Sequence, residues 1–214
     1  WVTKSEQPAV VELSSSYGID LHTDSIRCTP FGEIVDAQDP NLVIQIPTTH
    51  EDTAVAKQMR LLDNSLADLG ISVSTGPVVE FRLKSHIHRT SASGTVPLIY
   101  PAHFQDGYVS WPRTNGKKPN AMENTAATRK WLMPQGCYTL TRRFSSKEER
   151  RRIYAAVYDP ARINTDHVGF ENHLNVFHEK GGSLPPLLAR GLCLYLNSTI
   201  IDRYFRLFNG HTQV

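Results

Sequence analysis

Short runs of hydrophobic residues open the chain, and turn residues interrupt them every few positions. Within residues 9–47 these runs read AVVEL, GEIVDA and NLVIQIP, with Asp39-Pro40 before the last of them. Such runs predict strands. After residue 47, apolar residues recur three and four positions apart, which is the period of an α-helix. We therefore predict a prominent helix near residues 51–69, capped by Thr48 or Thr49 and stopped at Gly70.

Beyond residue 70 the pattern returns to short strands. The runs VPLIYP, YVSWP, GCYTLTRRF and RIYAAVYDP predict four strands, and ISVSTGPVVEFRLK places strand formers on both sides of a Thr75-Gly76-Pro77 break. The segment GFENHLNVFHE predicts a further strand or a loop. Between two of these strands, SSKEERRR predicts one or two helical turns, with Ser145 or Ser146 as the N-cap.

The end of the chain has a helical pattern. LPPLLARGLCLYLN and STIIDRYFRLFNG each carry an apolar face, and Asn197 and Ser198 interrupt the two. The predicted fold class is α+β: a mixed, largely antiparallel sheet with the helix near 51–69 and a helical C-terminal end. We expect one domain over 1–214 in three parts, which are an acidic part (1–70), a basic sheet part (71–183) and a helix pair (184–214).

Charge is distributed unevenly along the 214 residues, although the formal net charge is only +2. Residues 1–70 hold 4 basic and 11 acidic residues, whereas residues 71–214 hold 19 basic and 10 acidic residues. An excess of positive charge in one part of a protein favours a polyanionic partner.

Composition and the chain ends indicate the cellular compartment and whether the chain is a whole protein. No apolar run is long enough to predict a membrane span, and no secretory leader opens the sequence. Three widely separated cysteines suit a reducing compartment, so we expect a cytoplasmic protein without a membrane partner. The chain starts at Trp1 and ends directly after a helical pattern, from which we expect a piece of a longer protein.

The segment RRFSSKEERRR, residues 142–152, is the densest cluster of charge in the chain. Arginine presents a planar fork that matches phosphate oxygens and guanine edges, and a short connector between two strands would hold the charges close together. A solvated edge with internal Glu–Lys and Glu–Arg pairs is the alternative. The candidate nucleic-acid contacts are Arg142, Arg143, Lys147, Arg150, Arg151 and Arg152, with Lys117 and Lys118 nearby.

Amide and imidazole side chains form a second candidate group in the segment FENHLNVFH. Asn172, His173 and Asn175 could bond base edges, or they could satisfy local backbone groups. No phosphate-binding glycine loop and no nucleophile elbow occurs in the sequence. His86 and His88 are close in sequence, but the scattered cysteines do not complete a zinc site, and we predict no metal.

Several stretches together resemble a known family. STGPVVEFR, VPLIYP, RRFSSKEERRRI, FENHLN and GLCLYLNSTIIDRYFRLFNGHTQV are similar, in this order, to the C-terminal part of adenine-N6 DNA methyltransferases of bacterial restriction–modification systems, the PstI/BsuBI-like modification methylases. YLNSTIIDRYF also resembles a helix pair of TaqI-like specificity domains. The resemblance covers about residues 70–214, and the first 70 residues match it less distinctly.

The resemblance implies a target recognition domain that binds double-stranded DNA. Enzymes of this family bind S-adenosylmethionine and carry an Asn/Asp-Pro-Pro-Tyr/Phe motif in an N-terminal catalytic domain. This sequence lacks that motif, since its one Pro-Pro pair, at 185–186, lies in SLPPLL. The chain would therefore hold no cofactor and no catalytic residue, and it would depend on the missing catalytic domain of the same polypeptide for methylation.

If the chain binds DNA as a target recognition domain, we expect its residues to make different kinds of contact. We expect Lys147 and Arg150–Arg152 mainly on phosphates, whereas Arg142 and Arg143 reach a groove. The terminal residues Asn209, His211 and Gln213 are weaker candidates. Three other functions fit the same residues: an RNA-binding module, a protein interaction domain with a basic edge, and a nuclease that uses Glu80, Glu171 or His173.

Overall fold

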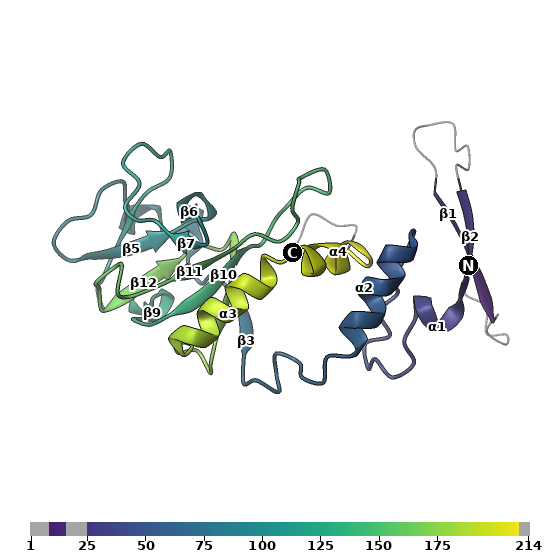
Figure 1. Cartoon of the computed structure of the whole chain (residues 1–214). Helices are drawn as coiled ribbons and strands as arrows, with labels where there is room; N and C mark the ends of the chain where they lie inside the picture. The colour runs from purple at the N-terminus through teal and green to yellow at the C-terminus, as the bar shows by residue number, and fades with distance from the viewer. Residues whose placement is uncertain (1–8, 16–24, 210–214) are drawn as a thin grey trace. The chain divides into compact units, whose positions relative to one another are not determined.

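A computed structural model of the chain describes residues 9–15 and 25–209 (Figure 1). Within these residues the chain forms two compact units. The first comprises the described residues up to Asp63 together with 203–209, and the second comprises residues 64–202. The prediction of one domain in three parts, with boundaries at 70 and 183, stays a prediction.

The first unit combines a two-stranded antiparallel ribbon with short helices. Its elements are β1 (Val10–Ser15), β2 (Ser25–Pro30), α1 (Phe31–Ile34) and α2 (His50–Arg60). Thr49 caps α2 as predicted, because its hydroxyl accepts from the Asp52 amide (3.1 Å) while the Asp52 carboxylate accepts from the Thr49 amide (3.0 Å). Arg203 also donates to the Asp52 carboxylate over 2.8 Å.

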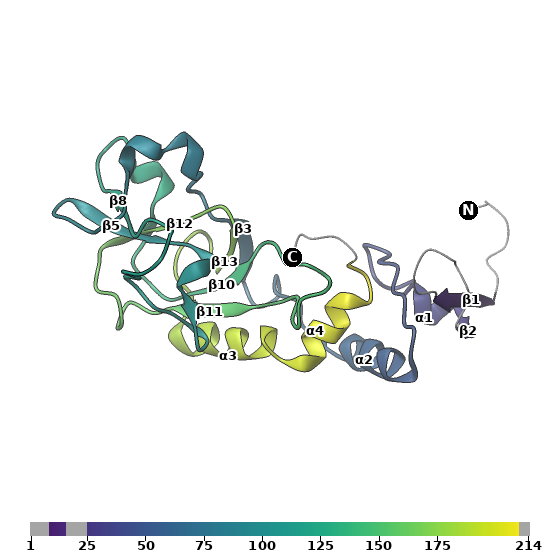
Figure 2. The same cartoon turned by 90° about the horizontal axis from the view of Figure 1, so that it is seen from above.

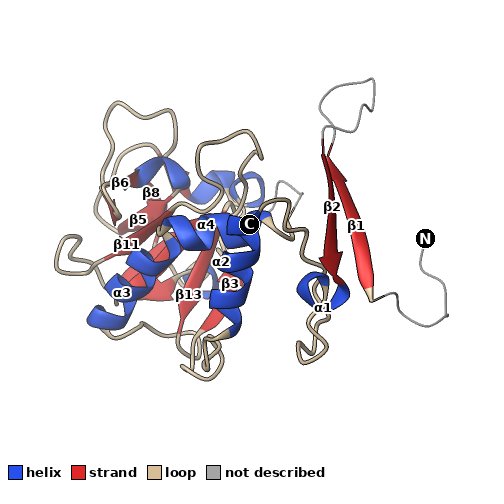
Figure 3. Cartoon of the chain, turned by 45° about the vertical axis from the view of Figure 1, so that its right-hand side comes forward, coloured by secondary structure: helices blue, strands red, loops and turns tan. Residues whose placement is uncertain are grey.

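Strands dominate the second unit, where they form two sheets (Figure 3). The six-stranded sheet has the order β3-β13-β10-β11-β7-β6 and consists of β3 (Ser72–Thr75), β13 (Leu174–His178), β10 (Tyr138–Arg142), β11 (Ala155–Tyr158), β7 (Tyr108–Val109) and β6 (Phe104–Gln105). All neighbours are antiparallel except β11 and β7. The sheet places β10 beside β13, which follows it at some distance in the sequence.

The five-stranded sheet has the order β4-β8-β5-β12-β9. Its strands are β4 (Ile87–His88), β8 (Ala121–Glu123), β5 (Thr95–Ile99), β12 (His167–Phe170) and β9 (Met133–Pro134), and only β5 and β12 run parallel. Short 3-10 turns at Glu80–Arg82, Lys84–His86, Pro101–His103 and Arg129–Trp131 connect the strands.

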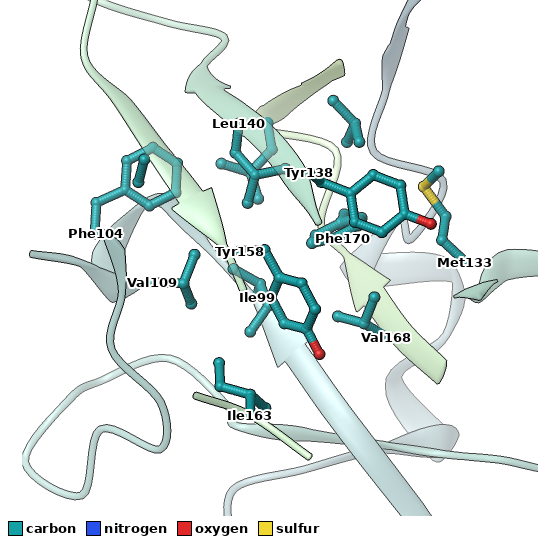
Figure 4. Close-up of a cluster of buried hydrophobic side chains, with 13 residues drawn as sticks. Ile99, Phe104, Val109, Met133, Tyr138, Leu140, Tyr158, Ile163, Val168 and Phe170 are labelled. Carbon is teal, nitrogen blue, oxygen red and sulfur yellow. The ribbon is translucent and has the colours of Figure 1, made fainter. Parts of the chain in front are cut away.

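The main hydrophobic core lies between these two sheets (Figure 4). Side chains alternate along a strand, so Tyr138 and Leu140 of β10 and Tyr158 of β11 enter this core together. There they meet Phe170 of β12, whose ring lies 5.3 Å from that of Tyr138 and 5.5 Å from that of Tyr158, both in edge-to-face geometry.

The opposite face of the six-stranded sheet carries a helix. Ala155 and Val157 of β11 point away from the first core and pack with Ala189 and Leu192 of α3 (Pro186–Leu196). Figures 1 and 2 show α3 lying along β10 and β11. The layers of the second unit are thus sheet, sheet and helix, and the helical end continues into α4 (Thr199–Arg206).

The α+β class and its largely antiparallel sheets are confirmed, but four local predictions need correction. The helix that begins at His50 ends at Arg60, and a separate turn follows in which Ser65 bonds Asp68. Residues 31–34 form α1 where a strand was predicted, and residues 41–47 form only an isolated bridge from Ile44 to Val35. The predicted helical turns in SSKEERRR are likewise absent, because residues 145–152 form turns and bends.

Candidate nucleic-acid interface

The predicted basic segment forms the connector between β10 and β11, residues 143–154. Hydrogen bonds at its base fix it to the sheet: the Arg143 amide donates to the His173 carbonyl (2.8 Å), and the Arg142 amide donates to the Tyr154 carbonyl (3.2 Å). Because the connector is hydrogen-bonded at the ends of strands, the sheet determines where the connector lies.

Glu149 forms hydrogen bonds inside the connector. Its carboxylate accepts from the Ser146 amide over 3.0 Å and from the Arg142 guanidinium over 2.6 and 2.7 Å. These two donors lower the pKa of Glu149 below its ordinary value, the backbone bond being the larger cause. The alternative of internal charge pairs is therefore realised for Arg142, although its side chain keeps 29% of its surface exposed.

Arg152 corrects the sequence-based prediction of a phosphate contact. Only 1% of its surface is exposed, its Nε donates to the Ser145 hydroxyl (2.9 Å), and its backbone amide donates to the Asp202 carboxylate (2.5 Å). A guanidinium at this depth cannot touch a DNA backbone. Arg152 anchors the connector to the protein interior.

The other cations of the connector lie at or near its surface. Lys147 and Arg150 are exposed, whereas Arg143 and Arg151 are half-buried. Arg151 bonds the Asn197 carbonyl at the end of α3, and the Asn197 side chain in turn bonds both backbone polar groups of Ala155. The connector is thus a loop that carries several cations and is fixed by hydrogen bonds at both ends.

A cleft of about 310 Å³ opens beside the connector and brings predicted candidates together. Arg142 comes from β10, His173 from the turn before β13, and Lys118 from the loop before β8. The remaining lining residues are Tyr100, Pro101, Ala102, Phe144 and Glu171. Residues from distant parts of the sequence therefore share one concave surface.

His173 is held rigidly in this cleft by Glu171. The carboxylate, which is 1% exposed, accepts from the His173 backbone amide over 2.9 Å and lies 2.6 Å from Nδ1 of its ring. Because Nδ1 is engaged, Nε2 is the ring nitrogen left for a ligand, and 55% of the side chain remains exposed.

Lys118 marks the opposite wall. Its ammonium bonds the Glu80 carboxylate over 2.8 Å and lies 5.0 Å from the centre of the Tyr100 ring. The bond to Lys118 lowers the pKa of Glu80, while burial and the carboxylates of Glu80 and Glu171 raise the pKa of Tyr100. This wall presents a paired cation above an aromatic ring.

The remaining candidates lie at the margins. Lys117 is exposed beside Lys118, and its carbonyl accepts from Arg89. Asn172 is half-buried and offers its carbonyl to Arg143 at 3.4 Å, while Asn175 is half-buried within β13. Asn209 belongs to the first unit, and His211 and Gln213 lie outside the described residues.

Two aromatic residues of the cleft escaped the sequence analysis. Phe144 is 37% exposed, with the Arg143 guanidinium 5.2 Å from its ring centre and the His173 ring 5.5 Å away. Tyr100 lies almost fully buried beneath Lys118. The signal for Phe144 was its place as a single apolar residue between two arginines and two serines.

The histidines of the five-stranded sheet bond one carboxylate. Nδ1 of His86 lies 2.7 Å and Nε2 of His88 lies 3.1 Å from the Glu123 carboxylate, whose pKa these bonds lower. Over residues 9–15 and 25–209, no three His, Cys, Asp or Glu side chains are arranged to hold a metal ion. In the same ranges no helix has the length and apolarity that crossing a membrane requires.

Comparison with known proteins gives two related sequences. The chain is 46% identical over 214 residues to the Type II methyltransferase M.PstI of Providencia stuartii, and 48% identical over 185 residues to the Type II methyltransferase M.BsuBI of Bacillus subtilis. These alignments cover 100% and 86% of this chain. They confirm the resemblance to PstI/BsuBI-like enzymes.

The related enzymes are considerably longer than this chain. The aligned region makes up 42% of M.PstI and 36% of M.BsuBI. No family model matches the sequence, and no solved structure matches it. The chain belongs to the family of these two enzymes and spans less than half of the length of either.

Proposed function

We propose that the second unit binds double-stranded DNA as the target recognition part of an adenine-N6 DNA methyltransferase of a restriction–modification system. The similarity to two type II methyltransferases supports the class of enzyme. The cleft supports the assignment of this unit to DNA, because it gathers Lys118, Arg142 and His173 beside a connector with exposed Lys147 and Arg150.

Exposed cations and the cleft suit different parts of a duplex. Lys147, Arg150 and Lys117 are exposed, so they can neutralise phosphates and fix the register of the protein. His173 lines the cleft, and Arg143 lies against Phe144 of the same lining, where shape and hydrogen bonding can distinguish base edges. Contacts of both kinds are needed for sequence-specific binding.

The partners follow from this assignment. The catalytic part of the parent enzyme would lie in the polypeptide outside this chain, bind S-adenosylmethionine and carry out methyl transfer. Extruding an adenine from the duplex costs a few kcal/mol, which a recognition unit offsets by holding the DNA. Such an enzyme acts on DNA in the bacterial cytoplasm.

The test is the salt dependence of DNA binding by the purified chain. Fluorescence anisotropy with a labelled duplex library gives the affinity at several salt concentrations. If about five phosphates are neutralised, log affinity falls with log salt at a slope of about −4 to −5. A slope near zero refutes the proposal.

Variants and competitors separate the proposal from its rivals. Combined Lys147→Ala and Arg150→Ala should weaken binding and make the slope shallower by about two. Tighter binding of structured RNA than of duplex DNA would identify an RNA-binding module instead. Binding that is insensitive to the double substitution would leave the connector without a role in DNA contact.

A further inference from the structure

The structure points to a specificity site for one thymine. We infer that Phe144 contacts the C5-methyl group of a thymine in the bound duplex, with the ring of His173 as the side wall of the same site. The inference rests on the proposed function, because it requires that the second unit bind DNA. It adds the residue that distinguishes thymine from other bases and the group of the base that this residue contacts.

Phe144 is exposed, as Phe81 and Tyr195 of this unit also are, and of these three it is the one that lines the cleft. Tyr138, Tyr158 and Phe170 are fully buried in the core between the sheets, whereas Phe144 lies at the surface, at the start of the basic connector and in the wall of the cleft. A large apolar side chain left at the surface within a basic segment gains stability when a ligand covers it.

The surroundings of Phe144 are preorganised. Its backbone neighbour Arg143 bonds the His173 carbonyl, and the Glu171 carboxylate fixes the His173 ring 5.5 Å from the Phe144 ring. Sites built on strand ends and fixed by buried hydrogen bonds hold their geometry better than sites on free loops. Phe144 and His173 therefore form a surface whose geometry is fixed before DNA binds.

The chemistry of this surface selects among base groups. The phenyl ring has no hydrogen-bonding atom, so it cannot read donors or acceptors, but it can cover a methyl group. In the major groove of DNA the C5-methyl of thymine is the apolar group that proteins contact with Phe, Ala or Thr side chains. The guanidinium of Arg143, 5.2 Å from the ring centre, would keep the site against the negatively charged duplex.

The experiment removes this methyl group from DNA one position at a time. Binding sites are first selected from a random duplex library with the unaltered chain, and each thymine is then replaced by deoxyuridine. At one position this replacement should weaken binding about fourfold, as expected for one buried methyl group at ~0.8 kcal/mol. With Phe144→Ala the same replacement should have no effect.

Lys147→Ala is the matched control, because it alters the same connector without touching the cleft lining. It should weaken binding to thymine and uracil duplexes equally and preserve their fourfold difference. Circular dichroism checks that both variants are folded, and Phe144→Leu should retain part of the difference.

The outcomes distinguish the two proposals. Absence of any DNA binding contradicts the proposed function. DNA binding in which no thymine-to-uracil effect depends on Phe144 overturns the thymine site while leaving the proposed function intact. Phe144→Ala binding that weakens only towards single-stranded RNA would show that the ring stacks on unpaired bases instead.

Discussion

Arg150 and Arg152 belong to one run of three arginines, yet their environments predict opposite consequences of substitution. Arg150 is exposed, whereas Arg152 is 1% exposed and donates from Nε to the Ser145 hydroxyl. We consider Arg152→Met, which keeps much of the side-chain volume but removes the guanidinium. The buried Ser145 hydroxyl would lose its guanidinium donor, whereas the bond from the Arg152 backbone amide to Asp202 would remain.

The magnitude follows from burial and charge. A hydrogen bond to a charged group contributes about 1.5–3 kcal/mol, and the bond from the Arg152 Nε to the Ser145 hydroxyl is of this kind. We expect Arg152→Met to lower the free energy of unfolding by about 3 kcal/mol. With a urea dependence of about 3 kcal/mol/M, the unfolding midpoint then falls by roughly 1 M.

The assay is urea unfolding followed by circular dichroism, with Arg150→Met as the matched control. Arg150→Met should change stability by less than about 0.5 kcal/mol, as surface substitutions usually do. It should instead reduce the salt slope of DNA binding by about 0.9. If Arg152→Met unfolded at the same urea concentration as the unaltered chain and weakened DNA binding as Arg150→Met does, the interior placement of Arg152 would be refuted.

Three further predictions concern packing, thiols and acid. Gly76→Ala should destabilise the chain by roughly 1–3 kcal/mol, because its Cβ would lie 2.3 Å from a backbone oxygen, whereas Gly191→Ala in α3 meets no atom within 4 Å and should stabilise it in urea unfolding. At pH 8 a thiol reagent should label exposed Cys28 rapidly and Cys193 slowly, since burial raises the pKa of Cys193 to about 11. The lowered pKa of Glu149 means that its stabilisation is present above pH 4.5 and is lost as pH falls through the lowered value, so amide exchange in the connector, corrected for intrinsic rates, should accelerate there.

Hydrophobic periodicity predicted most strands and the helical end, because packing reinforces local preference there. It failed where side chains bond their own backbone. The helical pattern of residues 51–69 breaks after Arg60, where Ser65 and Asp68 bond each other. In the connector, Glu149 binds the Ser146 amide as a capping residue would, but the carboxylate also holds Arg142, and no helix follows.

The candidate site was predictable in residue type but not in arrangement. Charge density identified the connector, yet it could not separate buried Arg152 from exposed Arg150, since both belong to one run of arginines. The meeting of Lys118 with His173 depends on sheet order, which strand patterns do not specify. Phe144 was missed because an isolated aromatic residue has no periodicity.

The order of the six-stranded sheet also has a consequence for synthesis of the chain. Among the strands of the described residues, β3 pairs only with β13, and β13 separates β3 from β10. A nascent polypeptide that has emerged only as far as residue 173 thus displays β3 without a neighbour and β10 as an open edge, the kind of surface that recruits strands from other molecules. The five residues of β13 then pair with both strands, so the edge of the sheet passes from β10 to β3 only when translation has gone beyond His178.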